Sequence, residues 1–256
     1  MNCPICKSTS NNVFYAEVLK KHKVEFFQCS TCRFVFTERA YWLKEAYEST
    51  INLTDTGIIE RNLYFSRVTS ALIFFLFNKK LSFVDYAGGY GIFTRLMRDI
   101  GFDYFWMDPY CDNLTARGFE YKQEELKQIE LLTAFEVFEH LQDPVKEISS
   151  MLKISKNIFF STQLVSDPPP TPDGWWYYGL EHGQHISFYS LKSLETIAKN
   201  FGLNFYSFKG LHLMTDKRIN FLIYKTIINL SNFGLFHLIK KLMPSRTWDD
   251  HLSLKK

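Results

Sequence analysis

Apolar residues recur along the chain at two spacings, and the two spacings alternate through its centre. A short apolar run at 81–84 is followed by apolar residues three and four positions apart from Ile92 to Ile100, which predicts a strand and then a helix. Further strands are predicted from apolar runs at 104–107, 131–135, 157–161 and 203–208. Further helices are predicted from helical spacing at 58–78, 145–152 and 191–201. This alternation is typical of a doubly wound α/β sheet, which binds ligands at the carboxyl ends of its strands.

The C-terminal part of the chain has a different pattern. Apolar residues mark one helical face at 219–230 and another at 235–242, and Pro244 then ends the helical run. We expect these helices to pack on the body of the protein. A homodimer contact and a contact with a membrane surface, which nearby lysines and arginines would favour, are the alternatives.

Composition and charge restrict the class of protein. A chain of 256 residues with 46% hydrophobic composition can bury one main domain and a small second one. Its formal net charge of +3 gives no strong signal for nucleic acid. No apolar stretch reaches the ~20 residues that a transmembrane helix needs, and the start, Met-Asn-Cys-Pro, does not resemble a signal peptide. We therefore predict a cytoplasmic protein without a transmembrane segment.

Two cysteine pairs lie near the N-terminus, with a strand-like run at 24–27 leading into the second pair. Each pair has the spacing Cys-x-x-Cys, and the four residues are Cys3, Cys6, Cys29 and Cys32. Tetrahedral Zn²⁺ takes four thiolates, two from each tight turn, so this spacing predicts a structural zinc ribbon. Two disulfides are disfavoured in a cytoplasmic protein, and a redox pair would need a single Cys-x-x-Cys.

A glycine-rich turn follows the predicted strand at 81–84. It reads Asp85-Tyr-Ala87-Gly88-Gly89-Tyr-Gly91, and Asp108 stands at the end of the next predicted strand. Glycines allow a tight turn with close approach to a ligand, and a carboxylate at that second position can accept the hydroxyls of a ribose. A nicotinamide site would need Gly-x-Gly-x-x-Gly, and Arg95 and Leu96 occupy the region of the third glycine. A glycine turn that binds no ligand is the remaining alternative.

This turn resembles the cofactor site of the class I S-adenosylmethionine-dependent methyltransferases. Their signature, Asp/Glu-x-Gly-x-Gly-x-Gly with a later acidic residue, matches at Asp85, Gly89, Gly91 and Asp108, while Ala87 replaces the first glycine. A second resemblance lies at 135–144, which is similar to the Leu-Glu-His-Leu-x-Asp-Pro run of small-molecule methyltransferases. The resemblance implies S-adenosylmethionine as the cofactor, bound by Asp85, Ala87, Gly88, Gly89, Gly91, Asp108, Pro109, Phe135 and Glu136.

An aromatic-rich stretch at 174–191 follows the predicted strand at 157–161. Such a loop could line a substrate cavity, and the titratable residues within it, Glu181, His182 and His185, could transfer protons. The alternative is that its aromatic residues belong to the core and its histidines are structural. His140, from the second motif, is a further candidate base.

The segment that begins at His185 also resembles the sugar C-methyltransferases, which start with a four-cysteine zinc ribbon. In those enzymes a Tyr-x-Glu precedes the catalytic His, which implies that His185, expected to titrate near neutral pH, is the base; here His182 and Gln184 replace the Tyr and the Glu. They also carry a large third domain for which this chain has no room, so carbon as the methyl acceptor is in doubt.

The sequence therefore predicts a small-molecule methyltransferase whose acceptor is a sugar, nucleotide-sugar or glycan precursor. A zinc-ribbon RNA methyltransferase is the alternative, but residues 1–40 mix basic and acidic side chains and show no basic face. A non-catalytic binding module is disfavoured because Asp108 is present. We divide the chain into a zinc ribbon (1–37), a helical linker or cap (38–80), a Rossmann-like methyltransferase domain (81–210) and a helical C-terminal extension (211–256).

Overall fold

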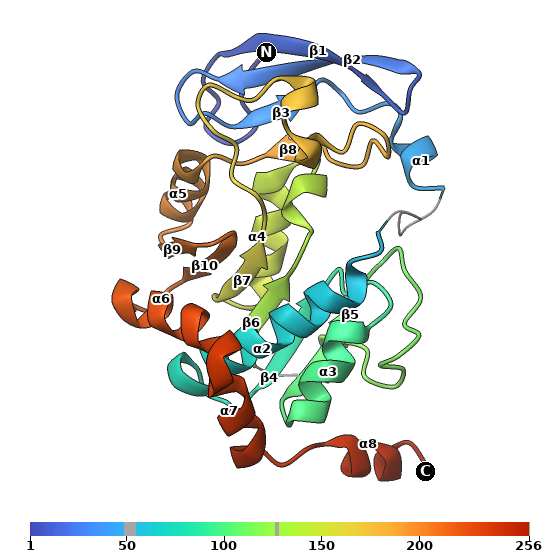
Figure 1. Cartoon of the computed structure of the whole chain (residues 1–256), viewed down its shortest axis with the longest axis vertical. Helices are drawn as coiled ribbons and strands as arrows, with labels where there is room; N and C mark the ends of the chain where they lie inside the picture. The colour runs from blue at the N-terminus through green and yellow to red at the C-terminus, as the bar shows by residue number, and fades with distance from the viewer. Residues whose placement is uncertain (49–54, 126–127, 256) are drawn as a thin grey trace. The chain divides into compact units, whose positions relative to one another are not determined.

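The structure is a computed structural model that describes residues 1–48, 55–125 and 128–255. The expected linker at 38–80 therefore lies in part, at 49–54, outside the described residues. The chain forms two compact units, and each is built from three segments (Figure 1). The first unit comprises Met1–Asn52, Glu136–Ser150 and Phe160–Asp216, and the second comprises Leu53–Phe135, Met151–Phe159 and Lys217–Lys256.

The centre of the second unit is a parallel arrangement of three strands. Strand β4 (Ser82–Tyr86) pairs in parallel with β5 (Asp103–Met107) on one side and with β6 (Ile129–Ala134) on the other. Every residue of β6 is buried, as expected for a parallel strand that is covered on both faces. Helix α2 (Ile58–Leu76) precedes β4, and α3 (Ile92–Ile100) connects β4 to β5.

The full sheet has six strands in the order β5-β4-β6-β7-β10-β9. Its remaining members are β7 (Ile158–Ser161), β9 (Asn204–Phe208) and β10 (Leu211–Thr215). The expected mixed α/β fold class is confirmed. One detail differs: the predicted strand at 203–208 does not complete the sheet alone, because β9 is an edge strand that pairs antiparallel with the unpredicted β10.

The C-terminal helices belong to the second unit and pack partly on α2. Helix α6 (Phe221–Leu230) and helix α7 (Phe236–Leu242) flank a short π-helical turn, and Figure 1 shows α7 beside α2. Ala71 of α2, Ile227 of α6 and Ile239 of α7 form one buried cluster. The exposed apolar residues of the same segment include Leu222, Phe233, Leu238 and Leu242. Packing on the body, which the sequence predicts, therefore accounts for only one face of these helices.

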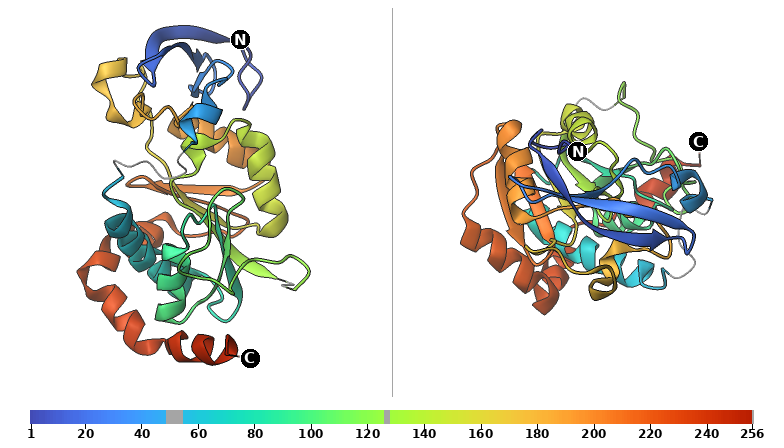
Figure 2. Two further views of the ribbon diagram at one scale, coloured as in Figure 1. Left: turned by 90° about the vertical axis from the view of Figure 1, so that its right-hand side faces the viewer. Right: turned by 90° about the horizontal axis from the view of Figure 1, so that it is seen from above.

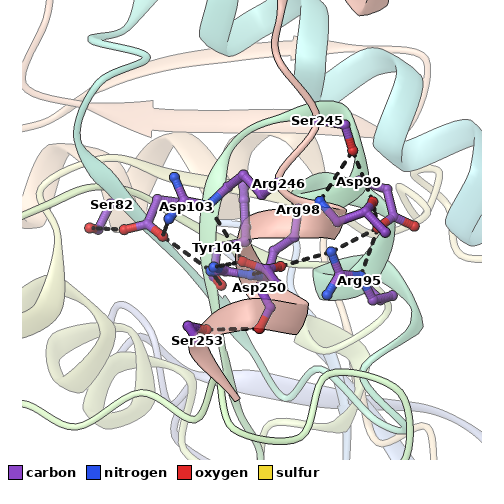
Figure 3. A network of polar contacts seen from close by, with 11 residues as sticks. Ser82, Arg95, Arg98, Asp99, Asp103, Tyr104, Ser245, Arg246, Asp250 and Ser253 are labelled. Carbon is purple, nitrogen blue, oxygen red and sulfur yellow. Dashed lines mark hydrogen bonds and ion pairs between the residues drawn. The ribbon is translucent and has the colours of Figure 1, made fainter. Parts of the chain in front are cut away.

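A final helix, α8 (Thr247–Ser253), follows Pro244 and was not predicted. A buried ion pair holds it to α3, because Arg98 Nε and Nη2 donate to the two carboxylate oxygens of Asp250 at 2.8 and 2.7 Å. Figure 3 shows Arg98 at the centre of this network, where it also donates to Asp103 at 3.1 Å. Both partners of the pair are almost fully buried, at 2% and 5% side-chain exposure, and each has a further ionic partner, Asp103 for Arg98 and Arg95 for Asp250.

The first unit contains a second, antiparallel sheet of four strands. Figure 2 shows its long hairpin, β1 (Ser10–Val18) with β2 (His22–Cys29), from two further sides. Strand β3 (Val35–Thr37) continues the sheet and pairs with β8 (Ser187–Phe188). Ser190 Oγ also donates to the carbonyl oxygen of Cys32 at 2.7 Å. The cysteine-bearing segment therefore shares one sheet with a strand more than 150 positions later in the chain.

Three α-helices of the described residues remain to be placed. Helix α4 (Pro144–Ile154) begins at its proline, as predicted, and α5 (Leu191–Asn200) is capped by Ser190, which accepts from Ser193 N. The short α1 (Leu43–Ala46) follows β3. Within the part of the chain that the structure describes, no helix is both long enough and apolar enough to cross a membrane.

Candidate active site

The glycine turn connects β4 to α3 in the second unit, and its backbone enters the left-handed region three times. The φ angles are 54° at Ala87, 52° at Gly89 and 81° at Gly91. A side chain at Gly91 would also clash, because a Cβ there would lie 2.6 Å from Asn113 Oδ1. Ala87 fits, but a non-glycine residue pays about 1–2 kcal/mol for this conformation. Alanine in place of the first glycine of the signature therefore costs backbone strain, but it does not prevent the turn from forming.

Asp85 lies beneath this turn and is 3% exposed. Thr94 Oγ1 donates to one of its carboxylate oxygens at 3.1 Å, and Thr133 Oγ1 donates to the other at 3.2 Å. Burial raises the pKa of Asp85 to about 7, against the opposing effect of these two hydrogen bonds. A Cβ at Gly88 would lie 2.6 Å from Asp85 Oδ2, so the missing side chain at Gly88 gives this carboxylate its space.

Asp108 holds the loop after β5 against the glycine turn. Its Oδ2 accepts from Gly89 N at 2.9 Å, while its Oδ1 accepts from Tyr110 N at 2.8 Å and from Cys111 N at 3.0 Å. Trp106 Nε1 donates to Gly89 O at 2.8 Å and braces the same turn. A carboxylate offers about four lone-pair sites, so three backbone donors leave room for about one more donor, such as a ribose hydroxyl.

The other predicted cofactor residues lie in different surroundings. Pro109 is exposed beside Asp108. Phe135 stacks on Phe65 with ring centroids 4.2 Å apart and contacts Phe93 edge-on at 5.1 Å. Glu136 belongs to the first unit. There Ser161 Oγ donates to Glu136 Oε1 at 2.5 Å and accepts from the backbone N–H of Glu136 at 2.8 Å.

The predicted proton-transfer residues lie in the first unit, and the structure brings three histidines together there. The His185 ring centroid lies 4.7 Å from that of His182 and 4.9 Å from that of His140. Burial lowers the pKa of His185 well below its usual value, and His140 and His182 lower it further. The expectation that His185 titrates near neutral pH is therefore wrong, because its ring is desolvated. Glu181 is exposed.

The aromatic loop is only partly what the sequence predicts. Tyr177 and Tyr178 are buried in a core cluster with Phe26 and Phe188 of the four-stranded sheet, whereas Trp176 is 79% exposed. The structural alternative therefore describes the two tyrosines correctly. The same loop still presents His185, whose Nδ1 lies 2.7 Å from the carbonyl oxygen of Tyr177.

Glu139 was missed as a candidate although it stands in the run 135–144 that the sequence singles out. Its side chain is fully buried, and its carboxylate has no hydrogen-bond partner among the described residues. Burial and the nearby Glu136 carboxylate raise its pKa to about 8. A carboxylate that directly precedes a histidine was the only sequence signal that could have pointed to it.

The four cysteines gather as predicted at one end of the antiparallel sheet, and none forms a disulfide. Their sulfur atoms all lie within 4.8 Å of one another, with Cys3–Cys32 at 3.6 Å and Cys6–Cys29 at 3.3 Å. Sulfurs around a tetrahedral Zn²⁺ with 2.3 Å bonds would be about 3.8 Å apart. Backbone N–H groups of Thr31 and Cys32 donate to Cys29 Sγ at 3.4 Å, which suits a charged thiolate ligand.

A comparison with protein families identifies the domain that contains this turn. A family described as a methyltransferase domain matches residues 60–207, which is more than half of the chain. The chain belongs to this methyltransferase family. The expected methyltransferase is thereby confirmed at the level of the family, and residues 1–59, with all four cysteines, precede the matched part.

Solved structures similar to this methyltransferase domain share little sequence with it. The plantazolicin methyltransferase BpumL in complex with SAH is 10% identical over 80% of this chain and 90% of its own, with a TM-score of 0.49. TnmH is 15% identical over 69% of this chain and 62% of its own, with a TM-score of 0.45. CalO1, a methyltransferase in calicheamicin biosynthesis, is 12% identical over 70% of this chain and 60% of its own, with a TM-score of 0.44.

The matched part thus spans less than two thirds of the length of TnmH and CalO1. A comparison with curated proteins found no match.

Proposed function

We propose that this chain is an S-adenosylmethionine-dependent methyltransferase that acts on a small molecule. The observation that carries the proposal is Asp108, whose carboxylate stands at the end of β5 and is tied to the glycine turn through Gly89 N–H. In a parallel sheet this edge is where nucleotide-like ligands bind, and the remaining lone pair of Asp108 suits a ribose hydroxyl. Membership of a methyltransferase family supports the same reading.

Within that function, Asp85 would act through the turn. Because its carboxylate is buried and accepts from two threonines, it shapes the backbone that the amino-acid end of the cofactor would meet. The bound cofactor supplies the methyl group on a sulfonium. The protein has to orient the acceptor and accept its proton, for which His185 remains the first candidate, followed by His182, Glu181 and His140.

The acceptor class that the sequence resemblance favours is a sugar, nucleotide-sugar or glycan precursor. Its test is a mass-difference screen in which the purified protein and S-adenosylmethionine are incubated with a panel of nucleotide-sugars. A gain of one methylene mass on one member supports the proposal. Methylation of an RNA panel with no product among the nucleotide-sugars would instead favour the RNA methyltransferase alternative.

We also propose that Cys3, Cys6, Cys29 and Cys32 bind one structural Zn²⁺. All four positions of a tetrahedral site would be protein thiolates, so no position remains for chemistry. The exposed apolar face of the C-terminal helices is consistent with a homodimer in the cytoplasm. Sedimentation at increasing protein concentration tests this, since a monomer at every concentration would contradict it.

The cofactor test is calorimetry with S-adenosylhomocysteine. We expect saturable binding with one site per chain. Absence of heat and of thermal stabilisation at millimolar ligand would contradict the proposal, because a ligand bound to the native state must raise the unfolding temperature.

A further inference from the structure

The starting point is the buried carboxylate of Glu139, the middle residue of the short helical turn Phe138–His140 in the first unit. Its side chain is 0% exposed, yet neither oxygen accepts a hydrogen bond from a described residue. The hydroxyls of Tyr177 and Thr162, which bond to each other at 3.2 Å, are near enough to oppose the rise of its pKa, but neither meets hydrogen-bond geometry with a Glu139 oxygen. A buried polar group without a partner costs about 1–3 kcal/mol, and more if it is charged. Such a group calls for a ligand that the protein chain does not supply.

The two histidines that cluster with Glu139 make contacts through their Nδ1 atoms. His140 Nδ1 lies 2.9 Å from the Tyr47 hydroxyl and 3.1 Å from the carbonyl oxygen of Gln184, and His185 Nδ1 lies 2.7 Å from the carbonyl oxygen of Tyr177. A carbonyl oxygen can only accept, so His185 Nδ1 carries the proton and its Nε2 holds an available lone pair. At His140 the tyrosine hydroxyl can donate or accept, so a proton on Nδ1 satisfies both contacts and leaves a lone pair on Nε2, as a metal ligand requires. Histidines that bind metals through one nitrogen commonly donate the other N–H to a backbone carbonyl in this way.

These three side chains converge on one point. One potential ligand atom from each of Glu139, His140 and His185 lies within 4.8 Å of the other two. No hydrogen bond or ion pair joins Glu139 to either ring among the described residues. Two ligands bound at 2.1 Å to the same ion are at most about 4.2 Å apart, so shifts of less than an ångström would close the cluster around an ion. The three side chains therefore make no hydrogen bond through Glu139 within the described part of the chain, and their ligand atoms are close enough to share a cation.

The donor set selects the class of ion. One carboxylate and two imidazoles form the ligand set of catalytic zinc sites and of the two-histidine, one-carboxylate iron sites, and such sites keep positions open for water or a substrate oxygen. Soft thiolates are absent from this cluster, which separates it chemically from the four-cysteine site.

We propose that Glu139, His140 and His185 form a second metal site, which binds a divalent first-row transition metal ion and leaves coordination positions open for an oxygen ligand. The site stands within the first unit, so it does not depend on the proposed cofactor site. It also assigns the Nε2 lone pairs of His185 and His140 to a cation, so that in the metal-bound protein the base would be His182 or Glu181. It explains why a carboxylate without a hydrogen-bond partner among the described residues persists in the core.

Mn²⁺ is the probe that tests the site, because it prefers carboxylate and other oxygen ligands and competes poorly for four thiolates. Wild-type protein that carries one zinc equivalent per chain, which the four thiolates take, is titrated with Mn²⁺. The loss of the free Mn²⁺ electron paramagnetic resonance signal is followed together with calorimetry. We expect one Mn²⁺ per chain and a rise in unfolding temperature. Glu139→Gln, which keeps the shape and removes the charge, should weaken binding by at least about 10-fold, since even outer-shell changes cost 10–100-fold.

The matched control is Glu195→Gln, on the exposed face of α5 in the same unit, which should bind Mn²⁺ like the wild type. Without metal, Glu139→Gln should unfold at no lower temperature than the wild type, because it removes a buried carboxyl group that has no partner. His185→Gln is a second ligand variant and should also lose Mn²⁺. Absence of Mn²⁺ binding to the wild type at millimolar concentration, or equal binding by both ligand variants, would overturn the proposal. S-adenosylhomocysteine calorimetry on the same samples reports the cofactor site separately.

Discussion

Replacing Asp108 by asparagine is the sharpest test of the cofactor site. The substitution keeps the size of the side chain, removes its charge and turns one acceptor oxygen into an NH₂ donor. In the structure the two oxygens accept from the backbone N–H groups of Gly89, Tyr110 and Cys111 at 2.8–3.0 Å. An asparagine can accept on one side only, so its amide nitrogen must oppose at least one of these donors.

The expected losses of stability and of cofactor affinity follow from the number of hydrogen bonds that the substitution removes. Losing one charge-assisted hydrogen bond costs about 1.5–3 kcal/mol, which should appear as lower stability of the turn. If the remaining lone pair of Asp108 binds the ribose, the affinity for S-adenosylhomocysteine should fall by a similar free energy, or roughly 10–150-fold. The structure thus predicts two effects of one substitution, because the same carboxylate shapes the turn and faces the ligand.

The assay combines calorimetry with S-adenosylhomocysteine at 25 °C and thermal unfolding of the same samples. Asp112→Asn is the matched control, since Asp112 is exposed and four positions further along the same loop. We expect wild-type affinity in the control and weakened binding by Asp108→Asn, measured well below its unfolding temperature. Equal affinity in wild type and Asp108→Asn would refute the ribose assignment, and equal weakening in the control would show that the loop as a whole had been disturbed.

Four further outcomes are expected. Elemental analysis should find one zinc per chain, bound to the four cysteines. Cys6→Ser should lose this zinc, and its residues 1–37 should become sensitive to proteolysis. Wild-type protein that is purified without chelator and contains no zinc would contradict the prediction. Asp250→Asn should lower the free energy of unfolding in urea by about 1.5–3 kcal/mol, because it removes the charged partner of the buried Arg98 Nε and Nη2, whereas the exposed Asp249→Asn should have little effect. Burial raises the pKa of Asp85 to about 7, so between about pH 4 and pH 7 the native state holds a proton that the unfolded state has released. The free energy of unfolding should therefore fall as pH rises through this range, by at most about 4 kcal/mol. Asp85→Asn should flatten that dependence. If His185 is the base, the acidic limb of kcat should lie well below pH 6.5, since burial lowers the pKa of its ring; a limb near 6.5 would assign the role to another group.

The sequence predicts the helices and strands of the centre well because each of them buries a face of its own. The predicted helices at 58–78 and 191–201 correspond to α2 (Ile58–Leu76) and α5 (Leu191–Asn200). Helix α8 escapes the same reasoning because it is held by Asp250, whose partner Arg98 stands 152 positions earlier. A charge pair between distant residues leaves no periodic trace in either segment.

The same limit applies to the first unit. The Cys-x-x-Cys spacing predicts where the four sulfurs gather, because each turn is local and short-range geometry decides it. The pairing of β3 with β8 joins residues such as Val35 and Phe188, and the short strand at 187–188 lies in a loop that the sequence presents as a line of aromatic residues. The boundary expected for the zinc ribbon at residue 37 remains a prediction, and the sheet in which the ribbon takes part extends to β8.

The predicted role of His185 shows that the residue type alone does not decide between a proton-transfer group and a metal ligand. An isolated imidazole titrates near pH 6.5, which suggests proton transfer for any histidine in a loop. In the structure Nδ1 of His185 is held by a carbonyl oxygen and only Nε2 has a lone pair to give. A proton and a metal ion compete for that pair, and because burial lowers the pKa of the ring, the proton leaves the pair available to a metal ion over a wider range of pH. The unpartnered Glu139 carboxylate favours a cation at the same place, since a cation would satisfy the acid and both rings together, whereas a proton could satisfy only one of them.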